Sequence, residues 1–339
     1  MQTPSAPVFL RSFVLALTAM ALAVFAVTEA FDPFGENSWQ PWPSPVRYAS
    51  RVLTAGAMLH RLDRESYALV FGTSRSAMVS AAATGEPTLN LYSIYGNPRA
   101  VLDFLNRLDG PRSGHVREIF YLLDRHTFCQ GCGIEEVDYT SFWSVLLYKL
   151  AHFPETANRL PLDLIRNIKI AMGRADLVGG ENGALLSRDP AAFDGSWTKR
   201  PIPPFPPKPF EDGTLALLGE IDALAHRRGW TIHYYVPTLP DAAVAGLDHA
   251  TLAAEKRRFL KVLPGYHDLS RIEGISEDPA NFSDAHHLNT MGARRAICAL
   301  RSERYLVTRE EAGRIDPALG WPGNLPPLPA ECRGRETPP

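Results

Sequence analysis

Short apolar runs alternate along the chain with stretches whose apolar residues recur every three or four positions, and this alternation is the strongest constraint on the fold. The runs expected to form strands lie at residues 67–71, 89–92, 118–123, 230–236 and 263–269, the last broken at its start by Pro264 and Gly265. Continuous apolar runs suit strands that are covered on both faces. Strands that alternate with helices predict a mostly parallel sheet of about five strands in a layered α/β fold.

Helical spacing marks the segments between these runs. Helices are expected over residues 97–108 and 213–228, and from about residue 289 onward. Gly229 is expected to end the second helix, because glycine readily adopts the left-handed conformation found just past helix ends. The domain is therefore predicted over residues 67–306, with a helical and proline-rich insertion at about 135–212 and a proline-rich C-terminal tail over residues 307–339.

The first segment is apolar from Val8 to Val27, with Arg11 near its start and acidic residues after its end. A span of about 20 apolar residues can cross a bilayer, and a basic flank before it leaves the amino end in the cytoplasm. We therefore expect residues 1–30 to be an uncleaved signal anchor, followed by a connector and a lead-in helix over residues 31–66. A cleaved signal peptide with an imperfect small-residue cleavage site is the alternative.

Composition excludes several classes of function. The 339-residue chain carries a net charge of −2, so it has no basic footprint for nucleic acid. It contains neither the glycine-rich loop that cradles phosphates nor the fingerprint of dinucleotide-binding domains. We therefore expect no nucleotide cofactor and no nucleic-acid partner.

Four cysteines in an exported chain are free to pair in an oxidising compartment. Cys298 and Cys332 could tie the tail to the last helix. Cys129 and Cys132 could form a tight local disulfide, a redox pair or half of a zinc site, and the second half of such a zinc site is missing. No metal is assigned to them.

Three residues suggest nucleophilic catalysis. Ser74 lies where the first strand runs into a Gly-Thr-Ser turn, and Asp284 and His287 follow about 210 residues later. A serine hydroxyl becomes a good nucleophile when a base takes its proton and an acid orients that base. Residues three apart are neighbours on a helical turn, so Asp284 and His287 are expected on one face of such a turn. Gly96 and Asp124 also follow predicted strands, which places them with Ser74 at the carboxyl edge of the sheet.

Other roles remain open for these residues. Ser74 or Thr73 could cap a helix, and Asp284 could cap the last helix. A metal site could be built from Asp284, His287 and the neighbouring His286 with His267.

The short blocks around these residues resemble the SGNH (GDSL-like) hydrolase superfamily. Residues 72–75 (Gly-Thr-Ser-Arg), 90–97 and 282–287 look like its first, second and last blocks, and the step from Asp268 to Ser270 also resembles its membrane-anchored bacterial members. Those members are related to alginate O-acetylation and D-alanyl-transfer proteins. The resemblance implies a three-layer flavodoxin-like fold on the periplasmic side of a bacterial inner membrane, held there by one helix.

The resemblance also implies roles for individual residues. Ser74 would be the nucleophile, His287 the base and Asp284 its orienting acid, with the backbone N–H of Gly96 donating to the oxyanion. Asn97 is a further candidate at the oxyanion or substrate. Arg75 could bind a substrate carboxylate or phosphate, pair with Asp124 or Asp284, or be an ordinary arginine of a first helical turn.

Asp124 departs from the family pattern, because the third block normally offers an asparagine as an oxyanion donor. An ionised carboxylate cannot donate and would repel the developing negative charge. The resemblance therefore predicts serine-dependent ester hydrolysis or O-acyl transfer on an envelope or exported polysaccharide, without a cofactor. The alternative is a non-catalytic or partner-dependent accessory protein that works beside a membrane-bound acyltransferase.

Overall fold

The computed structural model describes residues 6–31, 62, 65–92, 97–108, 110–128, 177–179, 185–187, 211–323 and 325–333. Its centre is a six-stranded sheet with the order β2-β1-β3-β6-β7-β8. All neighbours pair in parallel except β8, which runs antiparallel to β7 at the edge. The strands are β1 (Tyr67–Phe71), β2 (Thr88–Asn90), β3 (Val116–Leu122), β6 (Thr231–Val236), β7 (Gly265–Asp268) and β8 (Leu306–Thr308).

This strand order places a topological switch point between β1 and β3. From β1 the chain moves outward to β2 and then returns to the other side of β1 to form β3. The five parallel strands thus have the flavodoxin-like order, in which ligands bind outside the carboxyl ends of the strands where the direction of winding reverses. The loops that follow β1 and β3 carry Ser74 and Asp124.

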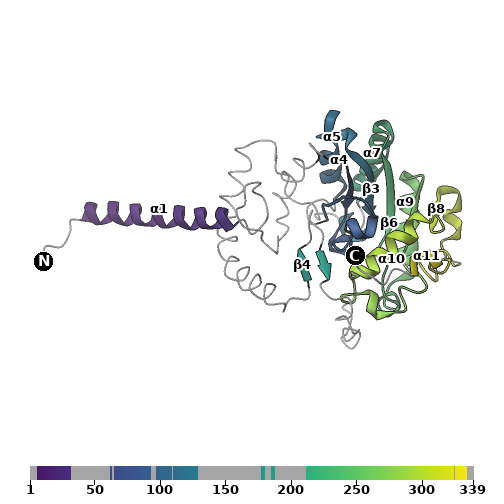
Figure 1. Ribbon diagram of the computed structural model, residues 1–339. Helices are drawn as coiled ribbons and strands as arrows, with labels where there is room; N and C mark the ends of the chain where they lie inside the picture. Colours follow the sequence, from purple (N-terminus) through teal and green to yellow (C-terminus); the bar gives the residue numbers. More distant parts are fainter. Residues whose placement is uncertain are drawn as a thin grey trace.

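Helices cover both faces of the sheet, which gives three layers (Figure 1). Alternate residues of β1 point to opposite faces, so Leu69 and Phe71 join one buried cluster and Ala68 and Val70 the other. The first cluster packs against α4 (Pro98–Asn106), α7 (Asp212–Arg228) and α9 (His249–Val262), and the second against α10 (Thr290–Arg301) and α11 (Ala330–Arg333).

The smaller elements lie between these. They are α3 (Ala81–Thr84), α5 (Gly110–Gly114), α8 (Asp241–Val244) and the 3-10 helices η1 (Ser74–Ser76), η2 (Arg125–Thr127), η6 (Pro279–Asn281) and η7 (Arg309–Arg314). Within the expected insertion, β4 (Leu177–Gly179) and β5 (Leu185–Ser187) form an antiparallel pair. The rest of that insertion up to Glu211 lies outside the described residues, as do Cys129, Cys132 and nearly all of the expected connector.

Helix α9 and strand β8 are among the elements that were not anticipated. Helix α9 was missed because the polar run from Glu255 to Arg258 interrupts its apolar spacing, although Glu255 and Lys256 are themselves buried. The expectation of a tail from residue 307 was wrong, since β8 completes the sheet there and Leu328 is buried in the second cluster.

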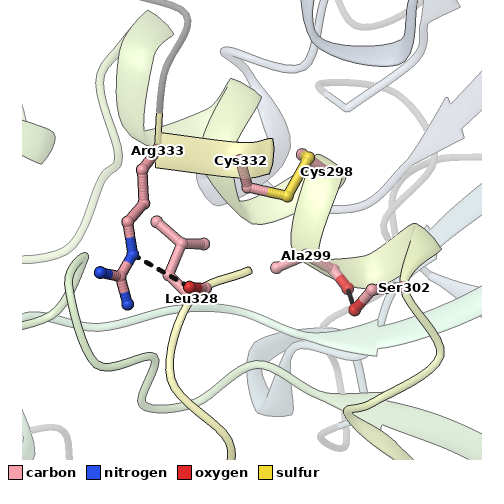
Figure 2. The surroundings of a disulfide bond; sticks show 6 residues. All are labelled: Cys298, Ala299, Ser302, Leu328, Cys332 and Arg333. Carbon is pink, nitrogen blue, oxygen red and sulfur yellow. Dashed lines mark hydrogen bonds between the residues drawn. A yellow bond between two sulfur atoms is a disulfide. The ribbon is translucent and has the colours of Figure 1, made fainter. Parts of the chain in front are cut away.

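Cys298 and Cys332, whose pairing the sequence left open as one possibility, form a disulfide that joins α11 to α10 (Figure 2). The guanidinium of Arg333 donates a hydrogen bond to the carbonyl oxygen of Leu328 at 3.1 Å beside it. The end of the described chain is therefore fastened to the last long helix by a covalent bond.

The N-terminal apolar segment forms the helix α1 (Ala6–Phe31). Large apolar side chains between Val8 and Leu22 are exposed, with Val8, Phe9, Leu10 and Phe13 each more than half accessible to solvent. Among the residues that the structure describes, no helix combines the length and apolar character required to cross a membrane. The single-pass anchor stays a prediction.

Candidate active site

The turn that carries Ser74 requires a glycine before it. Gly72 has φ +152°, and a Cβ there would lie 2.6 Å from Cβ of Leu122 on β3. The chain can therefore turn sharply out of β1 only without a side chain at this position. Thr73 then caps η1 by accepting a hydrogen bond from the Arg75 N–H at 3.4 Å, and the Ser74 side chain is exposed to solvent. Of the two candidate caps, Thr73 is the cap.

Asn90, at the end of β2, supports the turn from one side. Its buried side-chain amide donates to the carbonyl oxygens of Ser76 and Val79, both at 2.8 Å. Its side-chain oxygen accepts from the N–H of Tyr92 at 3.0 Å. The sequence placed Asn90 in a family block but did not reveal this supporting role, because the contacts reach back 14 and 11 residues to the segment that follows β1.

Asp124, after β3, holds the turn from the other side. Thr73 Oγ1 donates to one carboxylate oxygen at 2.6 Å, and Arg75 Nη1 donates to the other at 3.2 Å. The Asp124 side chain is 1% exposed and that of Arg75 9% exposed, so this is a buried ion pair. We call these two contacts the Asp124 clamp. The Asp124 clamp thus contacts both residues that flank Ser74 in the sequence, Thr73 and Arg75. The positive charge of Arg75 balances the Asp124 carboxylate, which was expected to repel an oxyanion.

Asp284 and His287 lie in a closed loop rather than on the expected helical turn. The backbone of Phe282 pairs with that of Leu288, and the carbonyl oxygen of His287 accepts from the Ser283 N–H at 2.8 Å. Asp284 Oδ1 accepts from the backbone N–H groups of His286 and His287 at 2.8 and 3.0 Å. The short side chain of aspartate thus folds the loop locally.

Asn289, not Asp284, caps the helix that follows this loop. Its side-chain oxygen accepts from the N–H of Gly292 at 2.9 Å at the start of α10. Gly292 permits a close approach, because a Cβ there would lie 2.1 Å from the carbonyl oxygen of Asn281. The position of the loop relative to α10 is fixed by these contacts, which leaves the Asp284 carboxylate available to His287.

The loop and the turn bring the three candidate residues together. Ser74 Oγ lies 2.8 Å from His287 Nε2, and His287 Nδ1 lies 2.8 Å from both carboxylate oxygens of Asp284. With its proton on Nδ1 and shared with the carboxylate, the imidazole presents the lone pair of Nε2 to the serine hydroxyl. This arrangement can draw the proton from Ser74.

The electrostatics keep Asp284 ionised. Burial, the largest single influence, raises its pKa, but the hydrogen bond and charge of His287, together with the backbone N–H donors, produce a net lowering. The pKa of the neighbouring His286 is also lowered, first by burial and then by the charge of Arg75. His286 is therefore neutral at neutral pH, and it adds no positive charge that would compete with His287 for Asp284.

Gly96 and Asn97 are the remaining candidate residues for the oxyanion or substrate. Gly96 lies outside the described residues. Asn97 caps α4, with its side-chain oxygen accepting from the Arg99 N–H at 2.8 Å. Among the described residues, no acceptor takes the backbone N–H of Ser74. The described parts of the chain contain no cluster of three His, Cys, Asp or Glu side chains able to hold a metal ion.

Comparison of the sequence with family models and with curated proteins finds no match to either. The resemblance to SGNH hydrolases therefore rests on the short blocks quoted above.

Proposed function

We propose that this protein transfers acyl groups through an acyl-serine intermediate, as an SGNH-type esterase or O-acyltransferase. The observation that carries the proposal is the continuous hydrogen-bonded chain from Ser74 Oγ through His287 to Asp284. Serine, histidine and aspartate in this geometry recur in unrelated folds that perform acyl transfer.

In the first half-reaction, Ser74 Oγ attacks the ester carbonyl carbon while His287 Nε2 takes the hydroxyl proton. The tetrahedral intermediate collapses, the bond to the leaving alcohol breaks, and His287 returns the proton to that alcohol. In the second half-reaction, a water molecule or another alcohol gives its proton to His287 and attacks the acyl carbon. The bond to Ser74 then breaks, and Ser74 Oγ regains the proton. Asp284 remains ionised throughout and stabilises the imidazolium.

The oxyanion requires donors that point at it. The backbone N–H of Ser74 is available for this task, and the family resemblance suggests the N–H of Gly96 as the second donor, with Asn97 nearby in sequence. Because Asp124 is paired with Arg75, its charge is largely offset at the site. This supports a functioning oxyanion site despite the missing asparagine.

The direct test is covalent labelling of the intact chain with a fluorophosphonate probe. We expect labelling in the wild type, none in Ser74→Ala and strongly reduced labelling in His287→Ala. Ser302→Ala, at the far end of α10, is the matched control and should label like the wild type. Equal labelling of Ser74→Ala and the wild type would refute the proposed nucleophile.

A second candidate function is a partner-dependent accessory protein of a polysaccharide acylation system. The observation that favours it is that Asp124 accepts two hydrogen bonds where the family has an oxyanion donor. If the folded protein fails to label alone and labels only beside a membrane-bound acyltransferase, this candidate replaces the first.

The proposed substrate is an acylated or acceptor carbohydrate of the bacterial envelope, reached from an inner-membrane anchor formed by residues 1–30. The exposed apolar side chains of α1 support this placement. The full chain should stay in the membrane pellet after alkaline carbonate extraction, and a chain starting at Asp32 should not. Release of the intact full chain into the supernatant would contradict the anchor.

A further inference from the structure

A pocket opens at the carboxyl edge of the sheet, beyond the ends of β3, β6 and β7. Its empty volume is about 690 Å³, which includes space open to solvent. Ser74 follows β1 at the same edge, and Arg75, the next residue, lines the pocket. The residue that follows the proposed nucleophile thus lines the pocket, and Ser74 itself does not.

Most of the exposed wall of this pocket is apolar, although charged side chains also line it. The apolar lining residues include Leu123 after β3, Val236 at the end of β6, Leu239, Trp321, and Leu252 and Phe259 of α9. Leu239, Val244 and Trp321 form a small buried cluster of their own, separate from the two main clusters. Such walls gain free energy by covering hydrocarbon and gain nothing comparable from a polar sugar.

The charged groups at the pocket are already engaged within the protein. Lys256 Nζ has three donors, and it contacts both carboxylate oxygens of Asp268 at 2.9 and 2.8 Å and Ser270 Oγ at 2.6 Å. Arg125 pairs with Glu255 at 3.0 Å, as Arg75 does with Asp124. An anionic ligand would have to break one of these pairs, because Lys256, Arg125 and Arg75 are each already paired with a carboxylate, whereas an uncharged apolar group would leave all of them intact.

We infer that this pocket receives the hydrocarbon part of the transferred acyl group, and that the protein prefers acyl chains longer than acetyl. The inference rests on the proposed function. The ester carbonyl lies at Ser74 Oγ, and the chain extends past Arg75 between the ends of β3 and β6. The carbohydrate lies on the open side of Ser74, away from the apolar walls.

The first experiment measures kcat/KM of the intact chain for p-nitrophenyl esters from acetate to decanoate. Each methylene that enters the pocket should raise kcat/KM by about fourfold until the pocket is full, after which the values level off or fall. A profile that is highest for acetate and declines from there would overturn the inference.

Variants then test whether this pocket sets the preference. Leu252→Trp fills it and should abolish the gain in kcat/KM for longer chains relative to acetate. Leu306→Trp, on the exposed edge strand β8, is the control and should leave the whole profile unchanged. Leu239→Ala enlarges the pocket and should move the optimum to longer chains, which keeps the test decisive if the tryptophan variant fails to fold.

Failure of this inference differs from failure of the proposed function. If Ser74 is labelled by the fluorophosphonate but Leu252→Trp and Leu239→Ala leave the chain-length profile unchanged, the pocket does not hold the acyl group and the acyl-transfer proposal stands. If Ser74 is not labelled in the folded protein under any condition, the proposed function fails and this inference falls with it.

Discussion

At the scale of single residues, Asp124 is the position where the structure changes the interpretation most. In the sequence it stands as a missing asparagine, which predicts a weaker oxyanion site, and as one of several possible partners of Arg75. In the structure it accepts hydrogen bonds from Thr73 and Arg75, which lie 51 and 49 residues earlier in the chain. No local pattern indicates a contact of that range, so the clamp could not be derived from spacing.

Asp124 can be interpreted either as a missing oxyanion donor or as a residue that orients the turn at Ser74. The variant Asp124→Asn separates these interpretations, because they predict opposite changes in the labelling rate. If Asp124 orients the turn, the variant loses the ion pair with the buried Arg75, and fluorophosphonate labelling of Ser74 slows by tenfold or more. Removing one partner of a buried pair also costs about 3–5 kcal/mol of unfolding free energy. Labelling rates are compared on protein shown to be folded by circular dichroism.

Thr73→Val is the companion variant, since it removes one hydrogen bond of the clamp together with the long η1 capping bond and leaves the ion pair in place. It should slow labelling less than Asp124→Asn does. Faster labelling in Asp124→Asn would show instead that the amide restores an oxyanion donor, and the positioning role would be wrong.

The lowered pKa of the buried His267 makes the free energy of unfolding depend on pH. Burial, and next the nearby His233, lower its pKa to about 4. In the unfolded chain a histidine has a pKa of about 6.5. Between these values the unfolded state binds more protons, so stability is fully present above about pH 6.5 and is lost as the pH falls toward 4.

From pH 7 to pH 5, this one residue should lower the unfolding free energy by about 2 kcal/mol. Urea unfolding of the wild type and of His267→Phe at both pH values checks this. The contact between His233 Nε2 and the Glu118 carboxylate, at 3.4 Å, is kept in both proteins. An equal loss of stability in the two proteins would exclude His267 as the cause.

At the scale of elements, the sequence predicted the bounds of a helix or strand where apolar spacing and turn chemistry agreed. β1 was predicted with its observed bounds, and Gly229 ends α7 in the left-handed conformation as expected. Helix α9 was missed because Lys256 is buried against Asp268, a partner on β7 that the spacing does not reveal. Ser74, Asp284 and His287 were expected to act together and do lie in contact. The loop that presents Asp284 and His287 was not predicted, because its fold depends on side-chain hydrogen bonds to its own backbone.

The step from β1 into η1 can be tested by a single added methyl group. Gly72→Ala should destabilise the protein by about 2 kcal/mol or more, because the Cβ would collide with Leu122 and the positive φ is unfavourable for alanine. Ser74 would move with the turn, so labelling of the folded fraction should slow as well.

Gly213→Ala, in the first turn of α7, is the matched control. Its Cβ meets no atom within 4 Å, so the change should be neutral or stabilising by up to about 1 kcal/mol. Thermal unfolding of the two variants compares them directly. Equal melting temperatures would show that the turn tolerates a side chain at Gly72.

At the scale of the whole molecule, the disulfide between Cys298 and Cys332 closes the last part of the described chain onto α10. His287 lies before the start of that helix and Cys298 near its end, so the covalent link and the candidate site lie toward opposite ends of one element. The disulfide should therefore contribute to global stability without changing the reactivity of Ser74.

The bond spans 34 residues of sequence, for which the loop-entropy model gives about 4 kcal/mol of stabilisation. The double variant Cys298→Ala with Cys332→Ala should lower the urea midpoint accordingly, and a reductant should lower the wild-type midpoint to a similar value. Fluorophosphonate labelling of the folded double variant should match the wild type. If labelling slows in proportion to the loss of stability, the site depends on the closure of the C-terminal segment, and α10 transmits its position to the His287 loop.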